Sequence, residues 1–506
     1  MRLRCARLPG RPRLAGRDMI FGLFGCAWPT ATHGRDMPRH FPPLGLLFLF
    51  SLSPVQAQLP RLQVSDNRRY LVTQEGNPFL YLGDTAWELF HRLNREEADL
   101  YLQRRAAQGF TVIQAVVLAE FDGLTQPNAY GHVPLVDNDP ARPNQAYFEH
   151  VDYIVNKAES LGIYIGMLPT WGDKFNKRWG IGPEVFTPEN ARLYGEYLGE
   201  RYRDAPIIWI LGGDRIPEET EDFAIIRAMA EGLHQGDLGT HLMTYHPQGG
   251  RSSSEFFHDD AWLDFNMFQS GHGQYNNPNY VATLRAYQMQ PTKPVVDGEP
   301  NYEDHPVNWQ PANGWFDEFD SRRAGYWSML AGAMGHTYGN HNIWQMLQPA
   351  REPISWARTP WRQALTYPGA YQAGYMRALF ESRPWWLLRP DQSLLRSGPN
   401  TGGKEVRVAA AADGSCVLVY SPYGSTFTLS LTGLAVRLHG WWFNPRDNTY
   451  VEVGAIDVQP EMVFDPPSDE KRGNDWLLVL DDADKRYPPP GSAPIVQTST
   501  PSRSQP

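Results

Sequence analysis

Cysteine is scarce in this chain, which has three cysteines in 506 residues. Cys5 and Cys26 lie within the first 57 residues, so a chain cleaved after Ala57 keeps only Cys416. A single cysteine cannot form an internal disulfide, so the fold must be held together by its hydrophobic cores. Cys416 lies in an apolar run, 415–420, and we expect a buried strand residue rather than a reactive thiol.

An apolar run long enough to cross a membrane is also missing near the N-terminus. The run 44–53 is too short for a span, follows a short basic segment and precedes a small-x-small pattern at 55–57. This order predicts a signal peptide near 37–57 and a secreted or periplasmic protein. We interpret the Arg-rich residues 1–36 as the product of a start codon placed too early, so that the leader as a whole is 1–57.

Positive charge is in deficit, because 46 Lys and Arg face 56 Asp and Glu, for a net charge of −10. Residues 1–57 hold eight Arg and two Asp, so the rest of the chain carries −16. Such acidity argues against a nucleic-acid partner but not against a polysaccharide. The Gly-x-Gly-x-x-Gly and phosphate-loop motifs are missing too, which removes the usual signs of a nucleotide-binding open sheet.

Aromatic residues, by contrast, are abundant: they make up 13% of the chain and include 17 Trp and 24 Tyr. Flat rings pack well on the apolar faces of sugar rings, which favours a carbohydrate-binding cleft. Large cores and β-sandwiches also consume aromatics, so composition alone leaves both readings open.

Strand-like and helix-like segments alternate along residues 58–384. Asn94 with Glu97, and Thr187 followed by proline, predict helix starts between strands. Such alternation indicates a parallel sheet, and eight units favour an α/β fold of the closed (β/α)8, or TIM-barrel, type. The eight strand-like runs are 78–83, 110–117, 163–168, 207–211, 241–246, 265–270, 294–300 and 335–339.

The pattern changes from about Trp385 onward. Short apolar runs separated by Gly, Asp and Pro turns predict a small antiparallel β-sandwich over 385–485, which we expect to pack against the barrel. The Pro/Ser/Thr-rich end, 486–506, predicts a disordered tail. The runs are 405–409, 416–420, 426–430, 435–439 and 476–480.

Two carboxylates follow the fourth and seventh predicted strands, where the catalytic loops of such barrels converge. Asp214 comes after two glycines that permit a tight turn, and Glu299 lies in Asp297-Gly-Glu-Pro300. Hydrolysis of a glycosidic bond needs a proton donor and a carboxylate, about 5–5.5 Å apart in retaining enzymes. We therefore predict Asp214 as general acid/base and Glu299 as nucleophile. The alternative is that both carboxylates cap neighbouring helices.

Further polar and aromatic residues near strand ends are candidates for substrate binding. For Asp84, a role as a helix cap is as well supported as hydrogen bonding to a sugar. Trp87 could equally be a core residue or a stacking platform for a sugar ring, whereas for Trp171 the platform is the favoured role. His272 belongs to the same group by position. The predicted set is Asp84, Trp87, Glu120, Trp171, Arg215, His246, Gln269, His336 and Tyr338.

Three of these residues bear on the catalytic pair. Arg215 is adjacent to Asp214 and would oppose the acid role by lowering its pKa, unless the guanidinium points elsewhere. Glu120 is a third carboxylate that could tune Asp214, or an exposed loop acid. Tyr338 could orient Glu299.

Four motifs together resemble the apiosidase-like glycoside hydrolases, glycoside hydrolase family 140 of the clan A barrels. They are Gly83-Asp-Thr-Ala-Trp87, Trp209-x-x-Gly-Gly-Asp214, Asp297-Gly-Glu-Pro300 and Ala333-x-Gly-His-Thr-Tyr-Gly339. The resemblance covers about 60–485. It implies a secreted bacterial retaining enzyme with a C-terminal β-sandwich, acting on plant cell-wall glycans such as apiose-containing pectin side chains. It also implies the acid/base and nucleophile roles for Asp214 and Glu299.

Many clan members carry Asn-Glu where this chain has Gly-Asp, and the apiosidase-like branch is similar in using Asp there. Substrate choice is expected to reside in the loops 121–144, 172–186 and 247–262. We expect no cofactor and no metal.

Two other classes remain open from the sequence. A metal-dependent barrel enzyme needs clustered ligands, whereas the histidines here are scattered. A non-catalytic carbohydrate- or matrix-binding protein would use the sandwich, with the tryptophan pairs 385–386 and 441–442 as platforms.

Overall fold

The computed structural model describes residues 58–492, 494 and 495. The predicted leader and signal peptide, with Cys5 and Cys26, lie outside the described residues. The first described elements form a small antiparallel sheet that precedes the barrel. Its strands are β1 (Leu62–Val64), β2 (Leu71–Thr73) and β3 (Pro78–Phe79).

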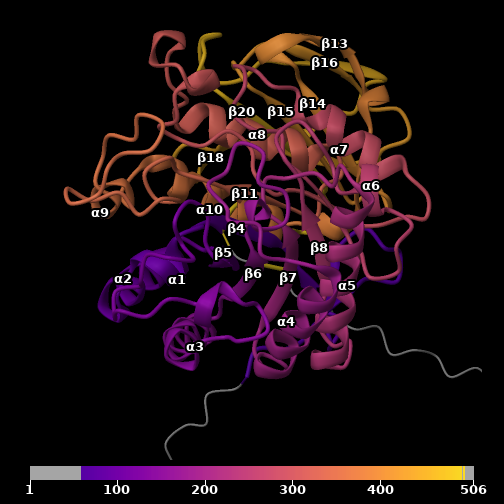
Figure 1. The fold of residues 1–506 in the computed structure, drawn as a ribbon. Coiled ribbons are helices and arrows are strands. Elements are labelled where there is room, and N and C mark those ends of the chain that lie inside the picture. The colour runs from indigo at the N-terminus through magenta and orange to yellow at the C-terminus, as the bar shows by residue number, and fades with distance from the viewer. Residues whose placement is uncertain (1–57, 493, 496–506) are drawn as a thin grey trace, which may run out of the picture. The chain divides into compact units, whose positions relative to one another are not determined.

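Eight parallel strands in chain order form the centre of the first domain (Figure 1). Six of them make one sheet in the order β11-β4-β5-β6-β7-β8, and the remaining two pair with each other. The strands are β4 (Tyr81–Thr85), β5 (Val112–Leu118), β6 (Tyr164–Thr170), β7 (Ile207–Gly212), β8 (Met243–His246), β9 (Asn266–Phe268), β10 (Val295–Asp297) and β11 (Gly335–Tyr338).

Hydrogen bonds connect the β9–β10 pair to both edges of the six-stranded sheet. The Thr244 hydroxyl, on β8, donates to the carbonyl of Phe265 at 2.7 Å. On the other side, the Met334 N–H donates to the carbonyl of Val295 at 2.9 Å. The eight strands therefore close on themselves, which confirms the predicted (β/α)8 barrel.

The fourth barrel strand, β7, shows how the barrel is packed. Ile208 and Ile210 belong to the apolar cluster inside the barrel. Ile207, Trp209 and Leu211 belong to the cluster between the strands and the surrounding helices. Because successive side chains of a strand point to opposite faces, this run is buried on both sides, as its continuous apolar sequence predicts.

Helices surround the strands, and the two whose caps the sequence predicts begin at those caps. The Asn94 side chain accepts from the Glu97 N–H while Glu97 accepts from the Asn94 N–H, a complete capping box. Thr187 forms a second capping box, with Pro188 at the first helical position. The helices are α1 (Leu89–Arg92), α2 (Arg95–Ala107), α3 (Gln145–Ser160), α4 (Pro188–Arg201), α5 (Thr220–Asp237), α6 (Ser254–Phe257), α7 (Asn279–Gln288), α8 (Glu318–Leu330), α9 (Trp361–Ala364) and α10 (Pro368–Glu381).

Short 3-10 turns interrupt the connecting loops. They are η1 (Val136–Asn138), η2 (Gly172–Lys174), η3 (Val307–Trp309), η4 (Pro311–Asn313), η5 (Trp385–Leu387), η6 (Gln392–Leu394) and η7 (Gly402–Lys404). Of the helices in the described part of the chain, none is both long and apolar enough to cross a membrane.

The C-terminal domain consists of two antiparallel sheets, ordered β12-β14-β15-β20-β17-β18 and β13-β16-β19. An apolar cluster fills the space between them, which confirms the predicted sandwich. Cys416 on β15 is buried, and burial raises the pKa of its thiol. The strands are β12 (Leu388–Pro390), β13 (Leu395–Ser397), β14 (Arg407–Ala411), β15 (Cys416–Ser421), β16 (Phe427–Ser430), β17 (Leu438–Asn444), β18 (Thr449–Ile456), β19 (Glu461–Phe464) and β20 (Trp476–Asp482).

Four of these strands, β12, β13, β18 and β19, are absent from the sequence prediction. Two of them, β12 and β13, have only three residues each, and β18 is exposed along most of its length. An exposed edge strand does not need the apolar alternation by which strands are recognised.

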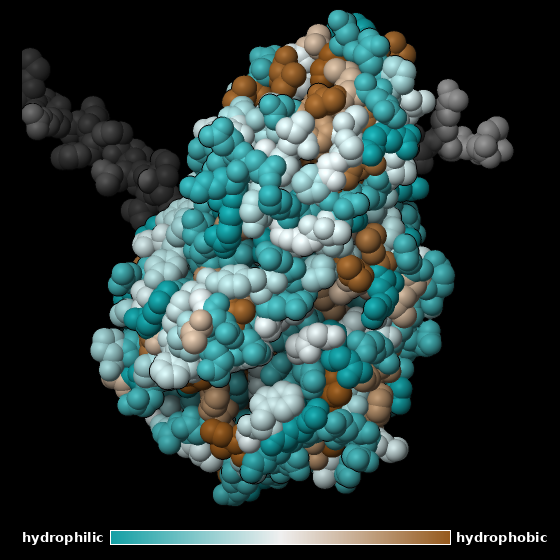
Figure 2. All heavy atoms as spheres, turned by 90° about the horizontal axis from the view of Figure 1, so that it is seen from above, coloured by the Kyte–Doolittle hydropathy of each residue, from teal (hydrophilic) through white to brown (hydrophobic). Residues whose placement is uncertain are grey.

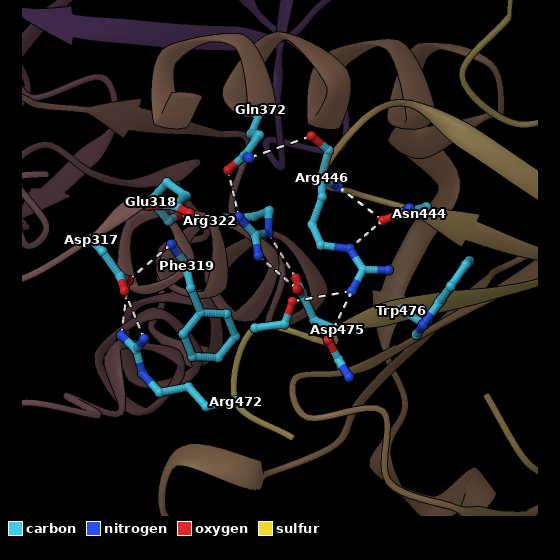
Figure 3. Close-up of polar contacts among 12 residues, drawn as sticks. Asp317, Glu318, Phe319, Arg322, Gln372, Asn444, Arg446, Arg472, Asp475 and Trp476 are labelled. Carbon is cyan, nitrogen blue, oxygen red and sulfur yellow. Dashed lines mark hydrogen bonds and ion pairs between the residues drawn. The ribbon is translucent and has the colours of Figure 1, made fainter. Parts of the chain in front are cut away.

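Buried ion pairs fix the sandwich to the barrel, as Figure 3 shows for Arg322 of α8. Arg322 donates from Nε and Nη2 to the two oxygens of Asp475, at 2.8 and 2.6 Å. The Tyr420 hydroxyl of β15 donates to the same carboxylate, and its ring stacks on Tyr326 of α8 at 4.9 Å. The sandwich thus packs against the barrel, as expected.

The predicted disordered tail from 486 is corrected for its first residues. The Gly491 N–H donates to the hydroxyl of Ser382, and the Ile495 N–H donates to the carbonyl of Glu381. The folded part therefore reaches beyond 485, and residues 493 and 496–506 lie outside the described ones.

On the face seen in Figure 2, apolar side chains form small separate groups among hydrophilic ones.

Removing the Arg322 side chain tests the domain contact. Arg322→Met leaves the buried carboxylate of Asp475 without its cation, so the free energy of unfolding should fall by about 3–5 kcal/mol. The matched control is Arg437→Met, because the ion pair of Arg437 with Asp484 is exposed. Its loss should lower the free energy of unfolding by less than about 1 kcal/mol. Urea unfolding of both variants measures the difference, and equal losses would contradict the role of the buried pair.

Candidate active site

The carboxyl ends of the barrel strands surround a cavity of about 800 Å³. Each of the eight loops that follow β4 to β11 contributes to its wall, which places residues far apart in sequence around one space. Asp214 and Glu299 both line it, so the structure brings the predicted catalytic pair together. One lining residue from each loop, in chain order, is Trp87, Glu120, Trp171, Asp214, Gln248, Gln269, Glu299 and His341.

A sharp turn after β7 presents Asp214 to the cavity. Gly212, Gly213 and Asp214 all have positive φ, at 90°, 107° and 54°. A Cβ on Gly212 would lie 2.5 Å from the carbonyl of His246, and one on Gly213 would lie 3.0 Å from the backbone of Gly172. Only glycine fits both positions, so the Gly-Gly pair before the acid is a geometric requirement.

Two histidines hold the carboxylate of Glu299. His272 Nε2 lies 3.1 Å from Oε1 in a hydrogen bond. His246 Nε2 lies 3.1 Å from Oε2 of Glu299, but the angles of this contact do not meet those of a hydrogen bond. Each oxygen of Glu299 thus faces one imidazole nitrogen, which fixes the carboxylate from both sides.

Backbone hydrogen bonds fix the tautomers of these histidines. The Asp214 N–H donates to Nδ1 of His246 at 3.3 Å, and the Tyr302 N–H donates to Nδ1 of His272 at 3.4 Å. An Nδ1 that accepts leaves the proton of a neutral imidazole on Nε2. Both rings therefore present an N–H to Glu299.

The two carboxyls of the cavity have pKa values shifted in opposite directions. Burial alone would raise the pKa of Glu299, but the hydrogen bonds and charges of His246 and His272 lower it to about 2. Burial and the negative charge of Glu299 raise the pKa of Asp214 to about 6. Glu299 therefore stays ionised, while Asp214 holds a proton into the weakly acidic range.

Arg215 is almost fully buried, with 1% of its side chain exposed. Its Nη1 donates to the backbone carbonyl of Asp214 at 2.8 Å but lies 3.5 Å from the carboxylate. Nε and Nη2 donate to the carbonyls of Asn176 and Lys177. The guanidinium is directed mainly at backbone oxygens, so its lowering of the pKa of Asp214 is smaller than the opposing effects of burial and Glu299.

Glu120 is a third carboxyl on the cavity wall. Burial, followed by the charges of Glu88, Asp214 and Asp173, raises the pKa of Glu120 well above its usual range. Glu120 is thus close enough to Asp214 for the charge of Asp214 to act on it. A protonated Glu120 can donate a hydrogen bond to a sugar hydroxyl.

Tryptophans line the cavity at two depths. Trp87, Trp171 and Trp344 are buried, whereas Trp179 and Trp309 are 57% and 46% exposed. The first group forms the inner wall and the second group lies at the mouth. Of the predicted substrate-binding residues, those that line the cavity are Trp87, Glu120, Trp171 and Gln269.

Asp84 does not lie in the cavity, which corrects its prediction as a substrate ligand. It is fully buried and accepts hydrogen bonds from Tyr101 at 2.5 Å and from Arg105 Nε at 2.6 Å. On β4, Tyr81 belongs to the barrel interior and Leu82 to the outer cluster. Asp84 is two residues beyond Leu82 and points outward with it, toward α2.

The same alternation corrects the predictions for His336 and Tyr338 on β11. Both residues are buried outside the active-site cavity, in the layer between the barrel and α10. The Tyr338 hydroxyl donates to Glu303 at 2.5 Å, so it does not orient Glu299. Burial lowers the pKa of His336 to about 3 and keeps the ring neutral.

His246 and Arg215 also differ from their prediction as substrate ligands, because both lie behind the cavity wall. His246 has no exposed surface and acts on Glu299 instead. Tyr302 was missed altogether: its hydroxyl accepts from Trp87 Nε1 at 3.0 Å, and burial and the charge of Glu299 raise its pKa. Its place three residues after Glu299 was the only signal in the sequence.

The family model described as "Apiosidase-like, catalytic domain" matches residues 65–387. The chain belongs to this family. A second model, described as a collagen-binding domain of a collagenase, matches residues 389–481, the sandwich of this apiosidase-like protein.

Solved structures agree with this assignment. One, described as "Glycoside hydrolase", is 32% identical, with 85% of this chain and 98% of that chain covered and a TM-score of 0.78. Another, a glycoside hydrolase family 5 protein from Bacteroides vulgatus, is 33% identical, with 85% and 94% covered and a TM-score of 0.78. No curated protein matches the chain in sequence. The apiosidase-like protein is therefore a glycoside hydrolase.

A metal-dependent barrel enzyme is the alternative class of enzyme that the sequence allows. Within residues 58–492, 494 and 495, no group of three or more His, Cys, Asp or Glu side chains is arranged to hold a metal ion.

Asp84→Asn separates a structural role from substrate binding. The exchange removes the charge that partners the buried Arg105, so the free energy of unfolding should fall by about 3 kcal/mol or more. The KM for a glycoside should change less than about twofold, since Asp84 lies outside the cavity. Gln269→Ala, on the wall, should behave in the opposite way, with a higher KM and near-normal stability. A raised KM at unchanged stability for Asp84→Asn would restore the original prediction.

Proposed function

We propose that this glycoside hydrolase is a retaining enzyme, with Asp214 as general acid/base and Glu299 as nucleophile. Two carboxyls on the wall of one cavity support this proposal, because their pKa values are shifted in opposite directions: that of Asp214 to about 6 and that of Glu299 to about 2. Glycosidic hydrolysis needs one protonated and one ionised carboxyl at the start of the reaction, which supports the two roles, and the retaining course is the one that the family resemblance implies.

In the first step an oxygen of Glu299 attacks the anomeric carbon while Asp214 gives its proton to the glycosidic oxygen. The bond to the leaving sugar breaks, that sugar departs as an alcohol, and the other sugar stays bound to Glu299 as an ester. The ester carries no negative charge, so the main charge that raises the pKa of Asp214 is gone.

In the second step the ionised Asp214 takes a proton from water, whose oxygen attacks the same anomeric carbon. The carboxylate of Glu299 leaves, and Asp214 is protonated again for the next cycle. Two inversions at one carbon restore the original configuration. His246 and His272 support both steps, because they hold the Glu299 carboxylate in place and stabilise its charge when it leaves.

The proposed substrates are plant cell-wall glycans, and within them apiose-containing pectin side chains. This proposal is supported by the family match over 65–387 and by the tryptophans of the cavity wall, whose rings suit sugar faces. We also propose a secreted or periplasmic bacterial protein. The location rests on the signal-peptide pattern at 37–57, outside the described residues, and the bacterial source rests on the resemblance to the apiosidase-like family.

Substrates with activated leaving groups distinguish the two roles. Glu299→Gln should lose nearly all turnover on every substrate, because no nucleophile remains. Asp214→Ala should lose about 10²–10⁴-fold on an oligosaccharide but much less on a dinitrophenyl glycoside, whose leaving group needs little protonation. Steady-state rates on the two substrate types measure this, with circular dichroism as the folding control. Rescue of Glu299→Gln instead would reverse the roles.

The pH dependence follows from the same two groups. The reaction needs Asp214 protonated and Glu299 ionised, so kcat/KM should fall as the pH rises through about 6 and should hold down to low pH. In Asp214→Ala the loss above pH 6 should disappear when the substrate carries an activated leaving group. A basic limb that persists in this variant would assign it to another residue.

A further inference from the structure

Trp179 is an exposed tryptophan at the mouth of the cavity. It belongs to the loop after β6, lines the cavity and keeps 57% of its surface exposed. A single exposed aromatic side chain is common on a protein surface, so what distinguishes Trp179 is its place in the cavity wall and the contacts that orient it.

Arg215 holds this tryptophan in place. Its guanidinium lies over the indole ring, 4.0 Å from the centroid, and is itself buried. The same guanidinium donates to the carbonyls of Asn176 and Lys177, just before Trp179 in the chain. The residue next to the catalytic Asp214 thus ties the end of β7 to the β6 loop, and the cation–π contact fixes the ring.

The loop is built tightly around this guanidinium. A Cβ on Gly172 would lie 2.4 Å from Arg215 Cγ, and one on Gly180 would lie 2.8 Å from its Nη2. The carboxylate of Asp173 accepts from Lys174 Nζ at 2.6 Å and from the Gly182 N–H at 2.9 Å. These contacts give Trp179 a fixed orientation without covering it.

Different aromatic residues lie beside the two carboxyls, which defines a Glu299 end and an Asp214 end of the cavity. Around Glu299 lie His272, Tyr302 and Trp309, with the rings of His272 and Trp309 5.9 Å apart. Trp179 belongs to the Asp214 end, through Arg215. Glu299 bonds to the sugar that is retained, and Asp214 protonates the oxygen of the sugar that leaves, so the Asp214 end must receive the leaving sugar.

We propose that the exposed surface of Trp179 is the platform for the first sugar on the leaving-group side of the scissile bond, and that Arg215 positions it. The ligand is a pyranose or furanose ring of an oligosaccharide, bound through its apolar face. This proposal rests on the proposed roles of Asp214 and Glu299. It also gives Arg215 a task that its contact with the Asp214 carboxylate alone does not explain.

Two substrates that share the retained sugar test the platform. The first is the member of a panel of pectic and hemicellulosic oligosaccharides that the wild-type protein hydrolyses fastest. The second is the glycosyl fluoride of the same retained sugar, whose leaving group is a single atom. Trp179→Ala should lower kcat/KM on the oligosaccharide roughly tenfold, and on the fluoride less than about twofold. Trp179→Phe should recover most of the loss.

The matched control is Trp356→Ala, since Trp356 is 62% exposed but does not line the cavity. It should leave both substrates unaffected. Equal losses of Trp179→Ala on the two substrates, or no loss on the oligosaccharide, would overturn the platform. A fastest substrate without apiose would overturn the proposed glycan instead, and the platform would still be tested on that substrate.

Arg215→Lys tests the positioning role. Lysine keeps the positive charge beside Asp214 but loses the planar guanidinium and most of its hydrogen bonds. We expect the same selective loss on the oligosaccharide, with the basic limb of the pH profile near its wild-type position. A basic limb that shifts, with a loss on the oligosaccharide that follows this shift in pH, would show that Arg215 acts on Asp214 rather than through Trp179.

Discussion

The active site depends on keeping one negative charge ionised inside a buried cavity. Glu299 meets this condition because His246 and His272 each face one of its oxygens, and backbone N–H groups of Asp214 and Tyr302 set both tautomers. The retained charge then acts on Asp214 and raises its pKa. A single electrostatic arrangement therefore shifts the pKa values of both carboxyls, and Asp214 itself contributes the N–H that orients His246.

This arrangement exists only because the barrel closes. The residues around Glu299 come from the end of β8 and from the loops after β9 and β10. Strands β9 and β10 join the other six strands through a few hydrogen bonds, such as those of Thr244 and Met334. The sandwich packs on α8 of the barrel through the buried pair of Arg322 and Asp475 (Figure 3). It is fixed to the catalytic domain rather than attached by a free linker.

Three of the corrected residues share one physical cause. Asp84, His336 and Tyr338 lie within strands, where alternate side chains point away from the barrel axis, and all three point into the layer beneath the helices. Asp214 and Glu299 come after the last residue of their strands, where the chain turns over the opening. Nearness to a strand end in sequence does not separate these cases, because it does not say on which face a side chain lies.

The sequence by itself determined the eight strands, the capped helices, the sandwich and the positions of Asp214 and Glu299. These follow from local patterns: apolar period, capping residues, and an acid after glycines. The tertiary structure alone decided that His246 and His272 serve Glu299, that Tyr302 meets Trp87, and that Arg215 turns from Asp214 toward Trp179. The reason is that each of these contacts joins loops from different strands, and their geometry is set by barrel closure, which no local pattern records.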